Sequence, residues 1–272
     1  MKSGTVKQHP LLSLHSLLML VFIYLPIVFI VVFSFNDSRI SATWQGFTWN
    51  WYVSLFDNRH VMEALMNSLS IAFVSTVVST VLGTAAALAL RRRSSKKSKG
   101  IVGMLYLPIV VPDIIMGLSL LLLFSQFHIP LGKWTIIIAH ITFSISYVYV
   151  IVSSRLSGMG KQLEEAAQDL GATPWQTFRY ITLPSIWPGV IAGALIAFTL
   201  SIDDFMISFF VAGPNSTTLP IYIYGLVKRG ISPEINALCT LMILVSIILI
   251  LSAQILQSKG SGNKKKSTTF PF

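Results

Sequence analysis

The stretch from residue 164 to residue 184, EEAAQDLGATPWQTFRYITLP, is acidic at its start and contains a turn, yet long apolar runs precede and follow it. Of the 272 residues in the chain, 53% are hydrophobic and only 11% are charged, whereas a soluble domain carries about 25% charged residues. So few charges cannot cover a water-facing surface. Most of the surface is therefore expected to face lipid, and the quoted stretch is expected to be a polar segment between membrane spans.

Six apolar runs are long enough to cross a bilayer, whose hydrocarbon core needs about 20 apolar residues per helix. We therefore expect an all-α membrane protein with spans near residues 14–35, 65–90, 101–125, 134–154, 187–212 and 235–257. The first run is too long for a signal peptide and no cleavage pattern follows it, so it is expected to remain as a helix. The single cysteine, Cys239, lies in the last run and can form no intrachain disulfide.

The placement of lysine and arginine predicts the orientation in the membrane. With six spans, both termini lie on the same side as loops 91–100 and 155–186, and all but five of the 20 lysines and arginines lie there too. The five on the other side are Arg39, Arg59, Lys133, Lys228 and Arg229. Basic loops stay in the cytoplasm, so both termini are predicted to be cytoplasmic. The run RRRSSKKSK at 91–99 is expected to set this topology and to touch anionic lipid headgroups. It has no interleaved aromatic residues, so nucleic acid is not an expected partner.

The first half of the polar segment has the periodicity of a short amphipathic helix. Its apolar stripe consists of Leu163, Ala166, Ala167 and Leu170, and Glu164, Glu165 and Asp169 lie beside or opposite that stripe. Gly171 is placed to end the helix in a left-handed turn. Small alanine side chains let another surface approach closely, and the acids can pair with basic groups of a partner.

A second short helix is expected to begin directly afterwards and to end before Pro184. Its start signals are Thr173 as a cap, Pro174 at the first helical position and Gln176 three residues past the cap. The segment is thus predicted to be a helix–turn–helix, which either docks on a partner or lies against its own bundle. So long an insert in an otherwise compact chain favours a functional role.

The pattern of this segment resembles a known family motif. Glu165-Ala166-Ala167, then Gly171 after three residues, then Ile181-x-Leu183-Pro184 after nine more, resembles the EAA loop of binding-protein-dependent ABC permeases of the type I importer class. The resemblance implies a MetI-like fold of six transmembrane helices. It implies a core at 62–258, preceded by an N-terminal helix and outer loop at 1–61. The end of the chain, 259–272, departs from the family pattern and is expected to be a flexible cytoplasmic tail. The resemblance also implies docking on a cytoplasmic ATPase dimer through Glu165, Ala166, Ala167, Asp169, Gly171, Leu183 and Pro184.

The sequence contains no signal for chemistry within this chain. No GxxxxGK[ST] loop is present to cradle a nucleotide phosphate, and no nucleophile–base arrangement or metal-ligand spacing is visible. ATP hydrolysis is therefore expected on a separate partner, and we expect no enzyme activity, metal or cofactor here. His140, within the fourth span, is expected to be a packed or hydrogen-bonded helix residue.

Three acidic residues, Asp113, Asp203 and Asp204, fall within predicted spans. Charge inside a membrane is costly and tends to be functional. Pro108 and Pro112 predict a kink or break just before Asp113. No basic residue in a span is an obvious partner, so the trio favours a path for a cationic solute such as a multiply charged amine. Each acid alone could instead be a hydrogen-bonded helix-end or interface residue. Of the adjacent pair, one is expected to face the path while the other pairs with a helix or caps a break.

Three stretches resemble spermidine/putrescine permeases: PDI at 112–114, FTLSIDD at 198–204 and VKRGISPEINAL at 227–238. The resemblance implies a polyamine importer in a bacterial plasma (inner) membrane. Its other parts would be a second permease subunit, two ATPase copies and an extracellular-side polyamine-binding protein. Two alternatives stay open at this point. One is an import permease for another small solute, and the other is an ion-gradient-driven secondary carrier, although no inverted repeat is visible. The sequence does not decide between putrescine and spermidine.

Overall fold

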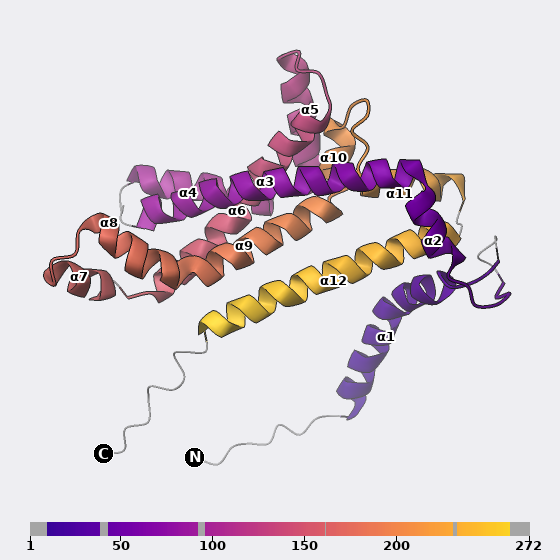
Figure 1. Ribbon diagram of the computed structural model, residues 1–272, viewed down its shortest axis with the longest axis horizontal. Helices are drawn as coiled ribbons and strands as arrows, with labels where there is room; N and C mark the ends of the chain where they lie inside the picture. Colours follow the sequence, from indigo (N-terminus) through magenta and orange to yellow (C-terminus); the bar gives the residue numbers. More distant parts are fainter. Residues whose placement is uncertain (1–9, 39–42, 92–95, 161, 231–232, 262–272) are drawn as a thin grey trace. The chain divides into compact units, whose positions relative to one another are not determined.

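The computed structural model describes residues 10–38, 43–91, 96–160, 162–230 and 233–261. All regular elements in these parts of the chain are helices (Figure 1). In chain order they are α1 (Pro10–Phe33), α2 (Asn50–Asp57), α3 (Arg59–Arg91), α4 (Lys96–Val110), α5 (Asp113–Gln126), α6 (Lys133–Gly158), α7 (Gln162–Asp169), α8 (Pro174–Thr177), the π-helix η1 (Phe178–Thr182), α9 (Leu183–Asp203), α10 (Met206–Val211), α11 (Leu219–Arg229) and α12 (Pro233–Ser261). The predicted all-α class is confirmed.

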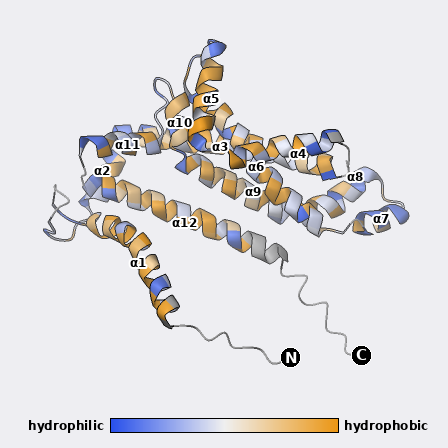
Figure 2. Cartoon of the chain, turned by 180° about the vertical axis from the view of Figure 1, so that it is seen from behind, coloured by the Kyte–Doolittle hydropathy of each residue, from blue (hydrophilic) through white to orange (hydrophobic). Residues whose placement is uncertain are grey.

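Five helical segments within the described residues are long and apolar enough to cross a membrane, and a bent pair of helices makes a sixth if it is counted as one span. The five are Ser13–Phe33, Arg59–Arg91, Lys133–Gly158, Pro174–Asp203 and Pro233–Ile255. None of the first span is buried within the chain, which is expected for a helix that faces lipid or another subunit. Figure 2 shows hydrophobic residues along α1, α9 and α12, whereas α7 is largely hydrophilic.

The expected third span is broken rather than continuous. It consists of α4 and α5, which meet at an angle of 110°. The prolines at 108 and 112 predicted a kink, and the structure puts the break at Val111 and Pro112, where Pro112 has extended backbone angles. Pro108 is accommodated inside α4. A proline cannot donate the backbone hydrogen bond that a continuous helix needs, so Pro112 separates the two halves and Asp113 begins the second.

The helical segment that contains the expected fifth span, 187–212, differs from that range at both ends. The continuous helical segment that contains this span begins at Pro174, because α8, η1 and α9 follow one another without a gap, and it ends at Asp203. Pro184 therefore does not end the short helix. It lies in the first turn of α9, directly after a wide turn in which the Leu183 N–H donates to the Phe178 carbonyl. This π-turn avoids the missing N–H and the ring clash that Pro184 would bring to a regular α-helix.

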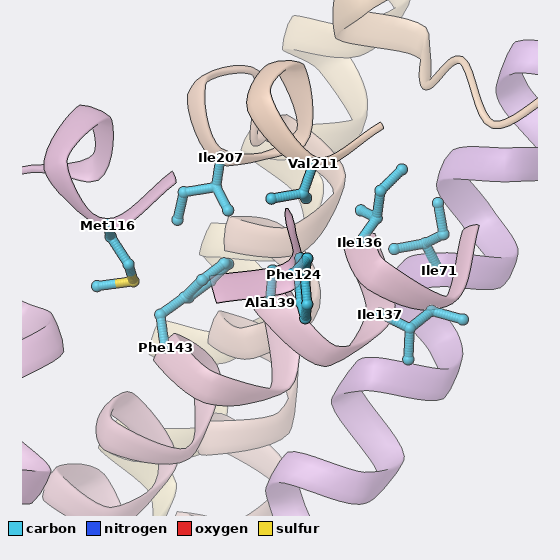
Figure 3. Packing of buried hydrophobic residues seen from close by; sticks show 9 residues of the cluster. All are labelled: Ile71, Met116, Phe124, Ile136, Ile137, Ala139, Phe143, Ile207 and Val211. Atoms are coloured by element: carbon cyan, nitrogen blue, oxygen red, sulfur yellow. The ribbon is translucent and has the colours of Figure 1, made fainter. Parts of the chain in front are cut away.

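Helix α6 lies at the centre of the buried core. Ile136, Ile137, Ala139 and Phe143 of α6 pack with Ile71 of α3, with Met116 and Phe124 of α5, and with Ile207 and Val211 of α10 (Figure 3). A second buried cluster surrounds Val148 of α6. Glycines allow close approach there, since a Cβ atom on Gly83 of α3 would meet Val148 at 2.8 Å and one on Gly193 of α9 would meet it at 3.5 Å. The GxxxG pattern at 189–193 thus serves contact within the bundle.

Contacts within the chain divide it into two units, Met1–Arg59 with Ile223–Ile243, and His60–Tyr222 with Leu244–Phe272. In the first unit, the loop after α1 is ordered around Asn36. Its side chain donates to the Thr43 carbonyl (2.7 Å) and accepts from the Gln45 N–H (2.9 Å), and its carbonyl accepts from the indole of Trp51 (2.8 Å). The division at 61 and 258 made from the sequence stays a prediction, and most of the expected tail, residues 262–272, lies outside the described residues.

Candidate functional site

The segment quoted at the outset folds as the expected helix–turn–helix in the second unit. Helix α7 ends in a left-handed turn at Gly171, whose φ is +88°. The Ala172 N–H donates to the Ala167 carbonyl at 3.0 Å and the Gly171 N–H to the Gln168 carbonyl at 2.9 Å, which is the bonding pattern of a Schellman C-cap. Any other residue at 171 would be strained by this backbone conformation.

The start of the second helix is also confirmed. The Thr173 hydroxyl accepts from the Gln176 N–H (3.3 Å), and the Gln176 side chain accepts from the Thr173 N–H (2.8 Å). Together they form a capping box, with Pro174 at the first helical turn. The C-cap of α7 and the N-cap of α8 follow each other closely around Gly171 and fix the short connection between the two helices. The resulting hairpin is therefore a defined element rather than a loose loop.

The hairpin exposes apolar side chains instead of burying them. Leu170 is 91% exposed, Tyr180 is 70% exposed and Trp175 is 65% exposed. An open depression lies among them, lined by Ala167, Leu170, Gly171, Ala172, Gln176 and Tyr180. Exposed apolar patches rimmed by polar residues are typical of protein–protein contacts. The alternative in which this segment packs its apolar stripe onto its own bundle is not what the structure shows.

The predicted coupling residues do not all share this surface. Ala167 and Gly171 line the depression, and Glu165, Ala166 and Asp169 are exposed on α7. Leu183 and Pro184 instead form the first turn of α9, on the far side of the π-turn from α8. They therefore connect the hairpin to the rest of α9, and the coupling role of the exposed α7 residues stays a prediction.

One acidic residue of α7 has a role that the sequence did not indicate. Glu164 is 6% exposed, and its Oε1 atom accepts from Nη1 of Arg91 at 2.7 Å and from the Thr182 hydroxyl at 2.7 Å. Arg91 also donates to the Met159 carbonyl at 3.1 Å. Glu164 is thus not one of the acids available to a partner. Its position beside the apolar stripe gave no sign of this, because Arg91 lies 73 residues away in the sequence.

The membrane acids Asp203 and Asp204 have different surroundings. The Asp204 carboxylate accepts from the backbone N–H groups of Ile207 (3.3 Å) and Ser208 (2.7 Å), and one of its oxygens lies 3.2 Å from Nε2 of His140. Its side chain is 8% exposed. Asp204 therefore accepts from backbone N–H groups in the first turn of α10, at the break after α9, much as a capping carboxylate does. That the other acid faces the path stays a prediction.

His140 joins Asp204 to a buried chain of hydroxyl groups. It is fully buried, and its Nδ1 atom lies 2.6 Å from the Ser201 hydroxyl, which in turn lies 3.1 Å from the hydroxyl of Ser75. The network links α3, α6, α9 and α10. The expectation that His140 is a hydrogen-bonded packing residue is confirmed. The sequence had suggested no partner for the acids within a span, because histidine is neutral in most settings.

Asp203 is exposed and Asp113 lies at the broken span. The Asp203 carboxylate accepts the Ser246 hydroxyl of α12 through both oxygens, at 3.0 and 2.9 Å. Asp113 begins α5 and its side chain is exposed. An exposed carboxylate within a span cannot face hydrocarbon cheaply. Asp203 is therefore expected to face a water-filled path or another subunit. Among the described residues, no cluster of three or more His, Cys, Asp or Glu side chains could hold a metal ion.

Comparisons with known proteins agree with this geometry. The family model described as binding-protein-dependent transport system inner membrane component matches residues 79–259. The chain is 42% identical to the spermidine/putrescine transport system permease protein PotC of Escherichia coli (strain K12), over 89% of this chain and 92% of that protein. It is 45% identical to the putrescine transport system permease protein PotI of the same organism, over 82% of each chain.

A solved structure supports the fold. A chain of the crystal structure of a bacterial ABC transporter involved in the import of the acidic polysaccharide alginate superposes with a TM-score of 0.70 at 18% identity, covering 92% of this chain and 94% of that chain. At so low an identity the likeness concerns the fold alone. It agrees with the MetI-like permease architecture expected from the EAA pattern.

Proposed function

The chain belongs to the family of binding-protein-dependent transport system inner membrane components, and from that premise we propose that it is a permease subunit of an ATP-driven importer for polyamines of the spermidine and putrescine class. The observation that carries the substrate class is its identity of more than two-fifths, over at least four-fifths of the chain, to permeases named for those amines. Import through a family of this description requires a binding protein outside and an energy source inside.

The exposed surface of the α7–α8 hairpin supports coupling to a separate ATPase. Leu170, Trp175 and Tyr180 offer apolar area around an open depression, and Glu165 and Asp169 lie on the same short helix as charged groups for a basic partner. Small residues at Ala166 and Ala167 permit close approach. In this proposal two ATPase copies bind the assembly, and one of them binds this hairpin.

We propose that the hairpin and both termini lie in the cytoplasm. The support is the charge asymmetry of the sequence, since loops 91–100 and 155–186 are basic and the loops on the other side carry few lysines or arginines. Because ATP is in the cytoplasm, this orientation also puts the exposed hairpin on the same side of the membrane as the ATPase. Cross-linking of the hairpin to a cytoplasmic subunit tests the orientation and the docking together.

For the translocation path, we propose that Asp113 and Asp203 bind the cationic amine. Asp204 instead holds the helices that line the path in position. Asp203 is exposed at the end of α9, so its carboxylate remains accessible although Ser246 donates to it. Asp204 is already occupied by two backbone N–H groups and His140. Carboxylates that line a path bind ammonium groups through charge-assisted hydrogen bonds, and a second permease subunit would complete the path.

The transport cycle follows from the continuity of α8, η1 and α9. Movement of the hairpin by the ATPase pair shifts α9 along its length, because no flexible loop separates the two. The far end of α9 carries Asp203 and the break at Asp204, so the same movement changes the wall of the path. The bundle then alternates between openings to the two sides of the membrane, which is a two-state change driven from a distant site.

Purification of the tagged chain from its native membrane, followed by reconstitution, tests this function. We expect an ATPase, a second permease and uptake of labelled spermidine or putrescine that depends on ATP and on a soluble binding protein. Recovery of the chain without any ATPase, and uptake driven by an ion gradient instead, would identify a secondary carrier. ATP-dependent uptake of another solute with no competition by polyamines would keep the importer and reject the substrate class.

A further inference from the structure

The coupling hairpin is joined to the bundle by a charged contact, in addition to its covalent continuity with α9. Glu164 is the one residue of α7 that is buried. Its Oε1 atom receives two donors, Nη1 of Arg91 and the hydroxyl of Thr182, each at 2.7 Å. Arg91 is the last residue of α3, and Thr182 is the last residue of the π-turn. A single carboxylate oxygen therefore joins α3, α7 and η1.

This contact is largely shielded from solvent and is fixed by more than one hydrogen bond. The side chains of Arg91 and Glu164 are 13% and 8% exposed, and Arg91 is fixed from its other nitrogen by the Met159 carbonyl just before the hairpin. Removing one member of a buried ion pair leaves the other charge without compensation, which is far more disruptive than losing an exposed pair. The leucines of α7 and of the turn after it give no comparable attachment, since Leu163 is 57% exposed and Leu170 is 91% exposed.

The position of Arg91 gives the contact a mechanical consequence. Helix α3 runs from Arg59 to Arg91 and packs against α6 through Gly83 and Val148. It also supplies Ser75 to the buried network around His140. A displacement of α7 that keeps the ion pair intact must therefore displace the end of α3. Helix α3 contributes to the same buried network around His140 as α9 does.

We propose that Arg91, Glu164 and Thr182 form a joint that transmits movement of the coupling hairpin to α3, so that the hairpin drives two helices of the bundle. These are positioning residues, since they act through the hairpin and contact neither nucleotide nor transported solute. The inference rests on the proposed function, because it assumes an ATPase on the hairpin. It assigns to Arg91 a task distinct from the topology signal of the basic run that it begins.

The test measures the number of polyamines transported per ATP hydrolysed rather than the amount of assembled protein. In the reconstituted assembly we expect Glu164→Gln and Arg91→Gln to lower the number of polyamines transported per ATP hydrolysed by about tenfold or more, within the range of coupling energies between distant sites, while the hairpin still binds the ATPase. Thr182→Val should have a smaller effect in the same direction. Lys97→Gln, which removes another cation from the same predicted side, should leave the ratio unchanged. A contact that serves stability alone would lower the amount of assembly and leave this ratio as in the unaltered protein, which would overturn the proposal.

Two further variants keep the test decisive if single changes prevent assembly. The exchange Arg91→Glu with Glu164→Arg should restore part of the coupling, because the Thr182 hydroxyl can accept from an arginine as well as donate to a carboxylate, whereas the hydrogen bond to the Met159 carbonyl is lost. In a Cys239→Ser background, Arg91→Cys with Glu164→Cys should be uncoupled as prepared and should regain coupling when a short bismaleimide links the two cysteines. Equal coupling with and without the linker would reject the joint. Absence of any ATPase from the unaltered assembly would instead reject the proposed function.

Discussion

Asp203 and Asp204 are adjacent in the sequence, but the fold gives their carboxylates different tasks. Asp204 is buried against two backbone N–H groups of α10 and against His140, whereas Asp203 is exposed and receives the hydroxyl of Ser246 from α12. A capping carboxylate stabilises a helix start, and an exposed carboxylate in a span is available to a cation. Paired substitutions at these two positions therefore separate stability from transport.

We expect Asp204→Asn to lower the free energy of unfolding by about 1–3 kcal/mol, the usual cost of weakening hydrogen bonds to a charged group. Asp203→Asn should leave stability nearly unchanged and lower spermidine uptake by about tenfold to a hundredfold, because a lost charge-assisted contact costs about 1.5–3 kcal/mol. Thermal unfolding in detergent and uptake into vesicles measure the two effects. Normal uptake by the Asp203→Asn variant would remove that residue from the path.

At the scale of elements, the π-turn η1 sets how the hairpin meets the fifth span. It lies between α8 and α9 and ends at Thr182, two residues before Pro184. A π-turn inserts one extra residue into a helix, and each residue turns the helix by about 100°. The turn therefore fixes the direction in which Trp175 and the rest of α8 face relative to α9. Because Pro184 cannot donate to the Tyr180 carbonyl, a regular α-helix is disfavoured at this point.

Replacement of Pro184 by alanine restores a backbone donor and removes the reason for the wide turn. We expect Pro184→Ala to rotate α8 relative to α9, and so to lower uptake several-fold while the permease pair still assembles. Pro188→Ala is the matched control, because Pro188 lies inside α9 without a π-turn. Uptake measured side by side for the two variants is the readout. Equal, unimpaired transport by both would show that the wide turn does not set the coupling geometry.

At the scale of the whole molecule, the features that the sequence predicted well are those that depend on nearby residues. Helix ends at Gly171 and Thr173 follow from local backbone chemistry, and the break at Pro112 follows from a missing N–H. The features that it missed depend on distant residues. Nothing near Glu164 indicates Arg91, and nothing near Asp204 indicates that His140 approaches it from another helix. The start of the continuous helix that leads into the fifth span was missed because Pro184 usually ends a helix, and a π-turn has no reliable sequence signal.

The central claim is that an ATPase subunit binds the surface of the α7–α8 hairpin. Leu170 is 91% exposed beside the depression of that hairpin, so a photoreactive amino acid in place of Leu170 should report its partner directly. We predict a cross-link from position 170 to a cytoplasmic ATPase subunit, and none from the same group in place of Ile248, an exposed residue of α12. An assembled, transporting complex in which position 170 never cross-links to the ATPase would contradict the account.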